Sequence, residues 1–318
     1  MALVYITSFI DFTIDDDELK QIRKDFPEHE IVRGGLKTDP SLREKAEIIF
    51  GYVKPEVLRG IPNLKWIHLP WAGVEPFLEM DEIKSGRLKL TNARGVYGPP
   101  ISEYILAMFL SMKHKLHLHR DEQHEEVWQP RTPEIEFSGS MVGIIGFGDI
   151  GSTLAKKCSA LGANVIAVKN TPAQKPDYVD ELVTADSIDD VLPRCDFLAL
   201  CMPGTGDTAG TLSKQRIEKL KTGVYIVNIG RGSAIDLEAL ADALKSGKVA
   251  AAGIDVFDTE PLPKGHELWH IPNCVITPHT SGRSPANKGR SVKIFLDNLR
   301  KYTDTGELDN LISVQKGY

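Results

Sequence analysis

A glycine-rich segment near the middle of the chain constrains its fold most strongly. The apolar run "VGII" ends directly in "GFGDIG", and "STLAKKCSAL" continues with helical spacing. The glycines of such a strand–loop–helix unit allow a tight turn, a close approach of backbone to ligand, and close packing of helix on strand. They are Gly146, Gly148 and Gly151. Because the first N–H groups of the helix, with Asp149 and Ile150 among them, can bind phosphate, the segment predicts a dinucleotide-binding Rossmann unit.

Apolar runs alternate with helix-like segments along the rest of the chain. The strands expected before residue 100 are "LVYITSF", "AEIIFGYV", "LKWIHLP" and "RLKLTNA". A second series begins at "SMVGIIGFG" and continues with "NVIAVKN", "CDFLALCMP", "VYIVNIG", "AAGIDVF" and "CVITPH". This alternation predicts an α/β fold with two doubly wound parallel-sheet domains.

The pattern changes near residues 100 and 285. "ISEYILAMFLSMKHKLHLHRDEQHEEVW" has helical spacing, is long for one helix, and is expected to join two domains. "GRSPANKGRSVKIFLDNLRKYTDTGEL" is a second amphipathic helix, suited to return the chain to the first domain. We therefore expect residues 1–100 plus 286–318 to form one domain and residues 101–285 to form an inserted dinucleotide-binding domain.

Composition excludes several classes of partner. The 318 residues carry a formal net charge of -6 without a long basic run, so nucleic acid is not an expected partner. No apolar run reaches the ~18 residues needed to cross a bilayer, and the N-terminus does not resemble a signal peptide. Four widely spaced cysteines fit reduced thiols and a cytoplasmic protein. They are Cys158, Cys195, Cys201 and Cys274.

The strand after the glycines bears on the choice of dinucleotide. An acidic residue about twenty positions on would bind the adenosine ribose and select NAD. Here "VIAVKNT" places Lys169, Asn170 and Thr171 instead. A lysine attracts a 2′-phosphate, so the segment favours NADP(H), with NAD(H) possible. The alternative is that Lys169 points to solvent and the chain uses NAD or both cofactors.

Three later strand ends carry polar residues after apolar runs. Arg231 follows "VYIVNIG", Asp255 and Glu260 follow "AAGI", and His279 follows "CVITP". In an open α/β sheet, ligands bind beyond the carboxyl ends of the strands. These four residues are therefore expected at the same edge of the sheet as the glycine segment.

The residue types fit hydride transfer between a nicotinamide and a 2-keto acid. Arg231 can bind a planar carboxylate through two parallel hydrogen bonds, and His279 is suited to acid–base chemistry near neutral pH. Glu260, if hydrogen-bonded to His279, would favour the imidazolium form. Each residue also has an ordinary alternative: Arg231 in a surface ion pair, Glu260 in a turn before Pro261, and His279 satisfied at a strand end.

At these segments the sequence resembles the D-isomer-specific 2-hydroxyacid dehydrogenases. The resemblance covers nearly the whole chain and is most specific in "GIIGFGDIG", "NIGRGSAID", "GIDVFDTEPLP" and "VITPHTSG". It implies a Rossmann cofactor domain inserted into a flavodoxin-like substrate domain, a D-2-hydroxy acid product, and Arg231, Glu260 and His279 as catalytic residues.

The resemblance also implies binding residues. Besides the glycine segment, the cofactor is expected on Met202, Pro203, Thr208, Ile229, Gly230, Asp255 and Ser281. The substrate is expected on backbone N–H groups of Ala72, Gly73 and Val74, and near Tyr97.

Lys169 makes the chain resemble the NADP-using glyoxylate and hydroxypyruvate reductases more than the NAD-using members. The expected function is NADPH-preferring reduction of small 2-keto acids. NAD-dependent D-2-hydroxyacid, phosphoglycerate-type and phosphite dehydrogenases remain open, whereas formate-oxidising relatives have glutamine where this chain has Glu260. An alternative of another class is a dinucleotide-sensing, corepressor-like interaction protein.

The family is usually a homodimer built through the cofactor domain. The segment "HLHRDEQHEEVWQP" is a candidate to reach the second subunit, with Trp128 at its interface or substrate pocket, although packing at a helix end is the alternative. The reaction needs no metal, so the histidines of this segment are interpreted as a solvated helix face. They are His114, His117, His119 and His124.

Overall fold

The computed structural model describes residues 2–8, 12–34, 40–133 and 135–315. Two compact units form, one from residues 1–96 and 285–318 and the other from residues 97–284. The sequence had suggested divisions after residues 100 and 285. The chain leaves the first unit once and returns to it, which confirms the expected insertion of one α/β domain into another.

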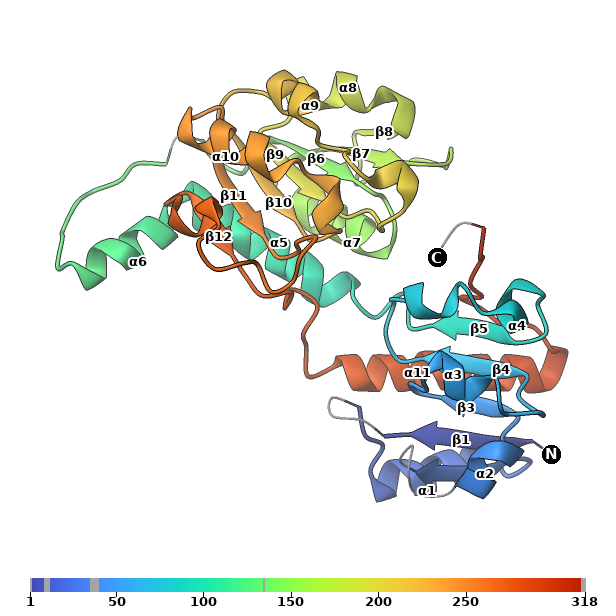
Figure 1. Ribbon diagram of the computed structural model, residues 1–318. Helices are drawn as coiled ribbons and strands as arrows, with labels where there is room; N and C mark the ends of the chain where they lie inside the picture. Colours follow the sequence, from blue (N-terminus) through green and yellow to red (C-terminus); the bar gives the residue numbers. More distant parts are fainter. Residues whose placement is uncertain (1, 9–11, 35–39, 134, 316–318) are drawn as a thin grey trace. The chain divides into compact units, whose positions relative to one another are not determined.

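The first unit is built on a five-stranded parallel sheet (Figure 1). Its spatial order is β2-β1-β3-β4-β5, the doubly wound order of flavodoxin-like folds, as expected. The strands are β1 (Leu3–Thr7), β2 (Glu30–Gly34), β3 (Ile48–Phe50), β4 (Trp66–Leu69) and β5 (Lys89–Asn92). The edge strand β2 was not among the expected strands.

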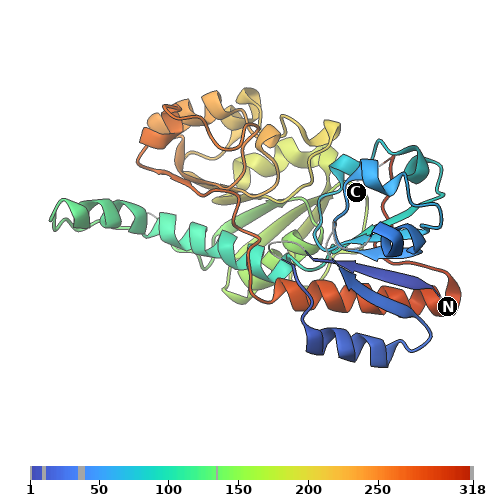
Figure 2. The same ribbon diagram turned by 60° about the horizontal axis from the view of Figure 1, so that its bottom comes forward.

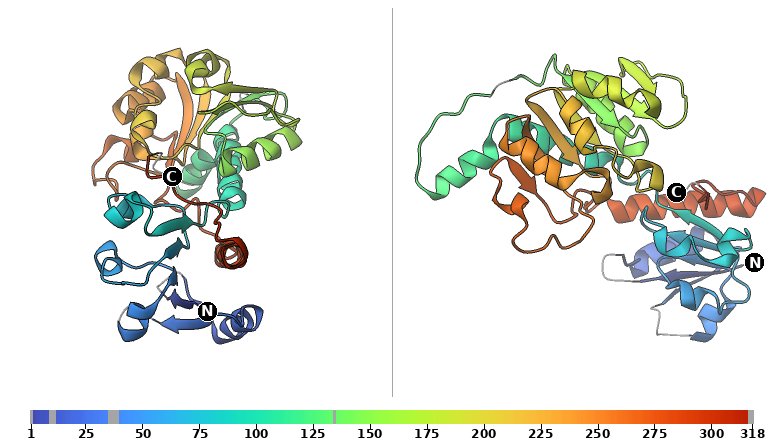
Figure 3. Two further views of the ribbon diagram at one scale, coloured as in Figure 1. Left: turned by 90° about the vertical axis from the view of Figure 1, so that its right-hand side faces the viewer. Right: turned by 45° about the horizontal axis from the view of Figure 1, so that its top comes forward.

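Helices cover both faces of this sheet. On one face, α1 and α11 pack on apolar side chains that include Phe50 and Trp66. Phe295 of α11 stacks on Phe50 with ring centroids 4.1 Å apart, and the left view of Figure 3 looks along α11 beside the sheet. Shorter helices cover the other face. The helices are α1 (Asp16–Asp25), α2 (Pro40–Lys45), α3 (Pro55–Leu58), α4 (Asp81–Lys84) and α11 (Asn287–Thr305).

The start of α1 shows how the local sequence fixes an element. The Asp15 carboxylate accepts hydrogen bonds from the N–H groups of Asp17 and Glu18, at 3.0 and 2.9 Å. Glu18 returns a carboxylate oxygen to the N–H of Asp15 at 2.9 Å, which completes a capping box. The acidic first turn and the basic last turn both complement the helix dipole.

The second unit is built on a seven-stranded parallel sheet in the order β12-β11-β10-β9-β6-β7-β8. From β6 outward this is the Rossmann arrangement with one additional strand. The strands are β6 (Met141–Ile145), β7 (Asn164–Lys169), β8 (Glu181–Thr184), β9 (Phe197–Leu200), β10 (Val224–Asn228), β11 (Val249–Ile254) and β12 (Cys274–Ile276). Its central strands are buried on both faces, which explains their continuous apolar sequences.

Helices also cover both faces of the larger sheet (Figure 1). The hydrophobic cluster on one face includes side chains of α5 and α7, and the cluster on the other includes side chains of α8, α9 and α10. The helices are α5 (Gly98–Lys113), α6 (Leu116–His124), α7 (Asp149–Ala160), α8 (Ile188–Val191), α9 (Lys214–Lys219) and α10 (Leu237–Lys245).

The long helix expected after Pro100 is two helices. Lys115 adopts a left-handed backbone conformation with φ of 57°, which ends the hydrogen-bonding pattern of α5 before α6 begins. Helix α6 ends at His124, before Trp128. Figure 2 shows the two helices nearly end to end, with α6 extending away from the sheet of its unit. The expectation of one continuous helix was therefore wrong.

Among the helices of the described ranges, none combines the length and apolar character required to cross a membrane.

Candidate active site

The candidate site lies at the carboxyl edge of the seven-stranded sheet. Strands β6 and β9 are neighbours there, but the chain runs from β6 to β7 on one side and continues from β9 to β10 on the other. Such a reversal of strand order is the usual place for a ligand in a doubly wound sheet. The segments after β6, β7, β9, β10, β11 and β12 contain the predicted cofactor and catalytic residues, whereas the predicted substrate residues lie after β4 and before α5.

Backbone packing explains the glycine segment after β6. Gly146 has φ of 101°, and a Cβ atom there would lie 2.6 Å from the Met202 nitrogen in the loop after β9. A Cβ atom on Gly151 would lie 2.1 Å from the Gly146 carbonyl oxygen. The two glycines therefore let the β6 and β9 loops and the start of α7 come together.

The start of α7 fits the pyrophosphate of a dinucleotide. A Cβ atom on Gly148 would meet nothing within 4 Å, so the backbone is open to a ligand. No side chain of the described residues caps α7, and the N–H of Ser152 donates to the Gly148 carbonyl at 2.9 Å. The preceding N–H groups of Ile150 and Gly151 are therefore available to phosphate oxygens.

The end of β7 lies beside this loop. The Val168 carbonyl accepts the N–H groups of Gly146 and Phe147 at 3.0 and 3.1 Å. Lys169, the next residue, is half-buried, and no carboxylate of the described residues forms an ion pair with it. Asn170 and Thr171 are exposed. A cation without an acidic partner fits a phosphate better than a ribose hydroxyl pair.

The loop after β9 is held by Thr208. Its hydroxyl donates to the Pro203 carbonyl at 2.6 Å and accepts the N–H of Thr205 at 2.9 Å. Met202 is buried, whereas Pro203 is exposed. Thr208 therefore shapes the loop, and a direct contact of its side chain with the cofactor stays a prediction.

Asn228, which the sequence analysis did not select, organises the loop after β10. It is fully buried, its Oδ1 accepts the Gly230 N–H at 3.0 Å, and its Nδ2 donates to the Arg231 carbonyl at 3.0 Å. The N–H of Ile229 donates to the Leu200 carbonyl at 3.2 Å, which ties this loop to β9. The sequence signal was an asparagine at the end of the apolar run "VYIVN".

His279 and Glu260 form a pair. The His279 Nδ1 atom lies 2.9 Å from Glu260 Oε2, and the other carboxylate oxygen accepts the Phe257 N–H at 3.0 Å. Burial acts to raise the pKa of Glu260, but the hydrogen bonds from Phe257 and His279 and the charges of His279 and Arg231 outweigh it, so the pKa lies below its usual value. Glu260 is thus ionised beside the imidazole.

Asp255 holds the backbone around His279. Its carboxylate is fully buried and accepts the N–H groups of Thr280 and Ser281 at 2.9 and 3.0 Å and the Thr277 hydroxyl at 2.6 Å. Its carbonyl accepts the N–H of His279 at 2.9 Å. The structure thus gives Asp255 and Ser281 a structural task, while their contact with a nicotinamide stays a prediction.

The expected substrate residues of the first unit follow β4. Asn92 Nδ2 donates to the Ala72 carbonyl at 2.6 Å, which fixes the start of the loop. Val74 is buried, and its carbonyl accepts the N–H of Phe77 at 2.9 Å. Within the described ranges, the N–H groups of Ala72, Gly73 and Val74 donate to no protein acceptor. They are therefore free to bind an anion.

Tyr97 belongs to the second unit, directly before α5. Burial raises the pKa of its phenol, so the group stays protonated.

Trp128 follows α6 and is 97% exposed. Leu116 at the start of α6 and Val127 are also exposed apolar residues. The alternative that Trp128 packs at a helix end does not hold within the described part of this chain, since almost all of its surface is open. In the same described part, the His, Cys, Asp and Glu side chains form no group of three or more suited to a metal ion.

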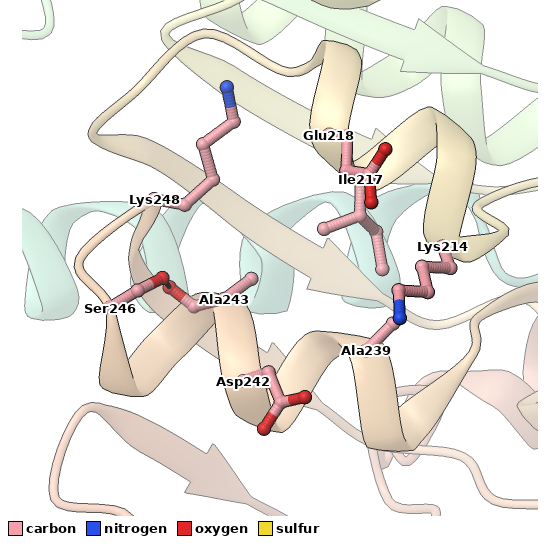
Figure 4. A pocket seen from close by; sticks show the side chains of 8 residues that line it. All are labelled: Lys214, Ile217, Glu218, Ala239, Asp242, Ala243, Ser246 and Lys248. Atoms are coloured by element: carbon pink, nitrogen blue, oxygen red, sulfur yellow. Dashed lines mark hydrogen bonds between the residues drawn. The ribbon is translucent and has the colours of Figure 1, made fainter.

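A surface groove of about 390 Å³ lies between α9 and α10 (Figure 4). Its lining includes Lys214, Glu218, Asp242 and Lys248, and none of the expected catalytic or cofactor residues. This groove is therefore separate from the candidate site in the loops at the strand ends.

Comparison with known proteins agrees with this geometry. The sequence model of the D-isomer specific 2-hydroxyacid dehydrogenase family, NAD binding domain, matches residues 106–281. A hydroxypyruvate reductase of Blautia hydrogenotrophica is 32% identical over 267 residues, which are 81% of this chain and 82% of the relative. A D-3-phosphoglycerate dehydrogenase of Mycobacterium bovis is 33% identical over 251 residues, which are 78% of this chain and 47% of the relative.

A solved structure extends the similarity to both units. A D-isomer specific 2-hydroxyacid dehydrogenase family protein from Aeromonas salmonicida superposes with a TM-score of 0.81 at 29% identity, covering 98% of each chain. The glycine loop, the strand order and these similarities agree. The chain therefore belongs to the D-isomer-specific 2-hydroxyacid dehydrogenase family and is an NAD(P)-dependent oxidoreductase.

Proposed function

We propose that this enzyme reduces small 2-keto acids of the glyoxylate and hydroxypyruvate type to D-2-hydroxy acids, with NADPH as the preferred cofactor. The observation that carries the proposal is the 2.9 Å pair of His279 and Glu260, with the charge of Arg231 close enough to act on the same carboxylate. Similarity to a hydroxypyruvate reductase over most of the chain supports the substrate class.

In this proposal, residues 97–284 provide cofactor binding and acid–base chemistry. The N–H groups of Ile150 and Gly151 hold the pyrophosphate, and Lys169 binds the 2′-phosphate. The bound dinucleotide supplies the hydride. Since Nδ1 of His279 is bonded to Glu260, Nε2 is the atom that delivers a proton to the carbonyl oxygen and recovers it in the reverse direction.

Arg231 binds the substrate carboxylate and polarises the carbonyl through its planar guanidinium. Glu260, ionised and anchored by the Phe257 N–H, orients the imidazole and favours its protonated form. Arg231 and Glu260 thus supply positioning and charge, while the histidine supplies the proton. The N–H groups of Ala72, Gly73 and Val74 in the first unit stay the predicted donors to a substrate carboxylate.

We also propose a homodimer formed through the cofactor domain. The exposed side chains of Leu116, Val127 and Trp128 give the α6 segment an apolar surface that a second copy would cover. Replacement of Trp128 by alanine is expected to shift the molar mass in solution toward the monomer or to raise KM. If both stay unchanged, Trp128 has no part in the dimer or the pocket.

The test is oxidation of NADPH and NADH in the presence of glyoxylate, hydroxypyruvate, pyruvate or phenylpyruvate. We expect turnover that favours NADPH and collapses in His279→Ala, while His270→Ala, an exposed histidine of the same unit, retains it. Turnover that favours NADH would remove the assigned role of Lys169. Tight dinucleotide binding without turnover on any keto acid would overturn the reductase function and favour a phosphite dehydrogenase or a sensing protein.

The similarity to a D-3-phosphoglycerate dehydrogenase favours a second candidate, oxidation of 3-phosphoglycerate with NAD. That substrate carries a phosphate besides its carboxylate, so its turnover requires a second group that binds an anion, either a cation or free backbone N–H groups. Assay of 3-phosphoglycerate beside the four keto acids separates the two functions directly.

A further inference from the structure

A chain of hydroxyl groups connects α5 to the loop of His279. The Tyr104 hydroxyl on α5 lies 2.5 Å from the Thr277 hydroxyl, which donates to the buried Asp255 carboxylate at 2.6 Å. Tyr104 and Thr277 are 173 positions apart in the sequence. The backbone N–H of His279 is bonded to the carbonyl of the same Asp255, at 2.9 Å.

The direction of each hydrogen bond in this series follows from the number of protons that each group can donate. Thr277 has one hydroxyl proton, and it is directed to Asp255. Tyr104 must therefore donate to the Thr277 oxygen. Burial, with a smaller contribution from Asp255, holds the pKa of Tyr104 well above its usual value, so this proton is present throughout the neutral range.

The residue directly before α5 contacts the loop on the other side of His279. A Cβ atom on Gly282 would lie 3.2 Å from the ring of this residue, Tyr97. Tyr97 and Tyr104 thus meet the loop at Gly282 and Thr277, on either side of the histidine. His279 itself has φ of 53°, a conformation that non-glycine residues adopt only when their surroundings impose it.

We propose that Tyr104 is a positioning residue for His279, acting through Thr277 and Asp255 to hold the histidine backbone in its left-handed conformation. This inference rests on the proposed role of His279. The tyrosine touches no reacting atom in this scheme. It keeps the imidazole beside Glu260, where Nε2 is directed to the substrate.

The kinetic test compares Tyr104→Phe with Tyr178→Phe. Tyr178 packs partly buried against the same hydrophobic cluster but has no hydroxyl hydrogen bond within the described residues. We expect Tyr104→Phe to lower kcat about tenfold, in the range for a misplaced catalytic group, with KM and dinucleotide Kd nearly unchanged. Tyr178→Phe should match the wild type. Equal kinetics in the two variants would overturn the proposal.

Variants of Thr277 provide a second test of the proposal. Thr277→Ser retains the hydroxyl and should retain activity, whereas Thr277→Val should lose at least as much as Tyr104→Phe. The double variant Tyr104→Phe, Thr277→Val should be no worse than Thr277→Val alone, because both changes break one chain of hydrogen bonds. Additive losses would show that Tyr104 acts by another route.

A readout that needs no turnover separates this inference from the proposed function. The ring Cε1–H resonance of His279, assigned with His279→Gln, should shift or broaden in Tyr104→Phe and stay in place in Tyr178→Phe. If the wild type reduces no keto acid while this resonance responds, the proposed function fails and the positioning role stands. An unmoved resonance in Tyr104→Phe overturns the positioning role whatever the activity.

Discussion

A Cβ atom on Gly232 would lie 2.1 Å from the backbone nitrogen of Asp258. The loop after β10 and the loop after β11 thus meet through bare backbone, one residue from Arg231 and two from Glu260. The charge of Arg231 also contributes to the lowered pKa of Glu260. We expect the two loops to act as one rigid support for Arg231 and Glu260, the proposed catalytic residues.

Gly232→Ala should therefore force the loops apart. We expect kcat/KM for keto acid reduction to fall by about a hundredfold and stability to fall by about 1–3 kcal/mol, because backbone cannot yield as a flexible side chain can. The control is Gly289→Ala, at an exposed position of α11 where a Cβ atom meets nothing within 4 Å. Steady-state kinetics measures kcat/KM, and urea unfolding measures the free energy of unfolding of each variant. Wild-type kinetics in Gly232→Ala would contradict the rigid support.

Glu260→Gln tests the charge of the pair. The pKa of Glu260 lies below its usual value, so in the wild type the carboxylate keeps its charge as pH falls and loses it only in the acid range. Wild-type kcat/KM should therefore decline in acid as Glu260 gains a proton. Glu260→Gln, which is neutral at every pH, should be slower than the wild type at neutral pH and should lack this acidic decline. Glu267→Gln, which changes an exposed carboxylate paired with Lys245, should leave the profile unchanged.

Lys169→Asp tests the choice of dinucleotide. An aspartate at the end of β7 would repel a 2′-phosphate and accept the ribose hydroxyls. We expect the ratio of kcat/KM with NADPH to kcat/KM with NADH to fall by at least about tenfold. This corresponds to about 1.4 kcal/mol, a reasonable value for the loss of one charged contact. Lys175→Asp, in the exposed loop beyond β7, is the matched control. If the ratio falls equally in both variants, the effect comes from the changed net charge of the unit and not from a contact of Lys169 with the cofactor.

His68 predicts a loss of stability in acid. The side chain is fully buried beside Phe50 and Phe295, and desolvation lowers its pKa to about 3. The unfolded chain binds a proton near the ordinary value of 6.5, so this contribution to stability is complete above that pH and is lost as pH falls toward 3.

The size of that loss can be measured. Between pH 7 and pH 5 the loss from His68 amounts to about 2 kcal/mol. In His68→Gln the amide can still form a hydrogen bond with Thr91. Over the same pH range its free energy of unfolding, measured with urea, should fall by about 2 kcal/mol less than that of the wild type. His270→Gln, at an exposed site, should behave as the wild type. Identical acid sensitivity of His68→Gln and wild type would contradict the assignment.

The sequence predicted the interior of the fold better than its edges. Central strands such as Met141–Ile145 are continuous apolar runs because they are covered on both faces. The edge strands Glu30–Gly34 and Glu181–Thr184 are partly exposed and contain charged residues, so their pattern did not stand out. The break at Lys115 was missed because no glycine or proline marks it in the sequence.

The candidate site divides in the same way. Local spacing identified the glycines, and the polar residues at the strand ends suggested the hydrogen bond between His279 and Glu260 that the structure contains. The contact of Tyr104 with Thr277 joins residues 173 positions apart, and no local pattern encodes it. Only the packing of α5 against the sheet brings the two hydroxyl groups together.

The interrupted first unit has a consequence for biosynthesis. Phe50 and Trp66 are made early, but Phe295 and Leu299, which cover them, lie in the last helix. During translation the second unit can fold as soon as its contiguous residues emerge, whereas the first must wait with one aromatic face uncovered. A nascent chain that stalls before residue 287 would expose that face to chaperones, so the first unit is completed only after the whole second unit has been made.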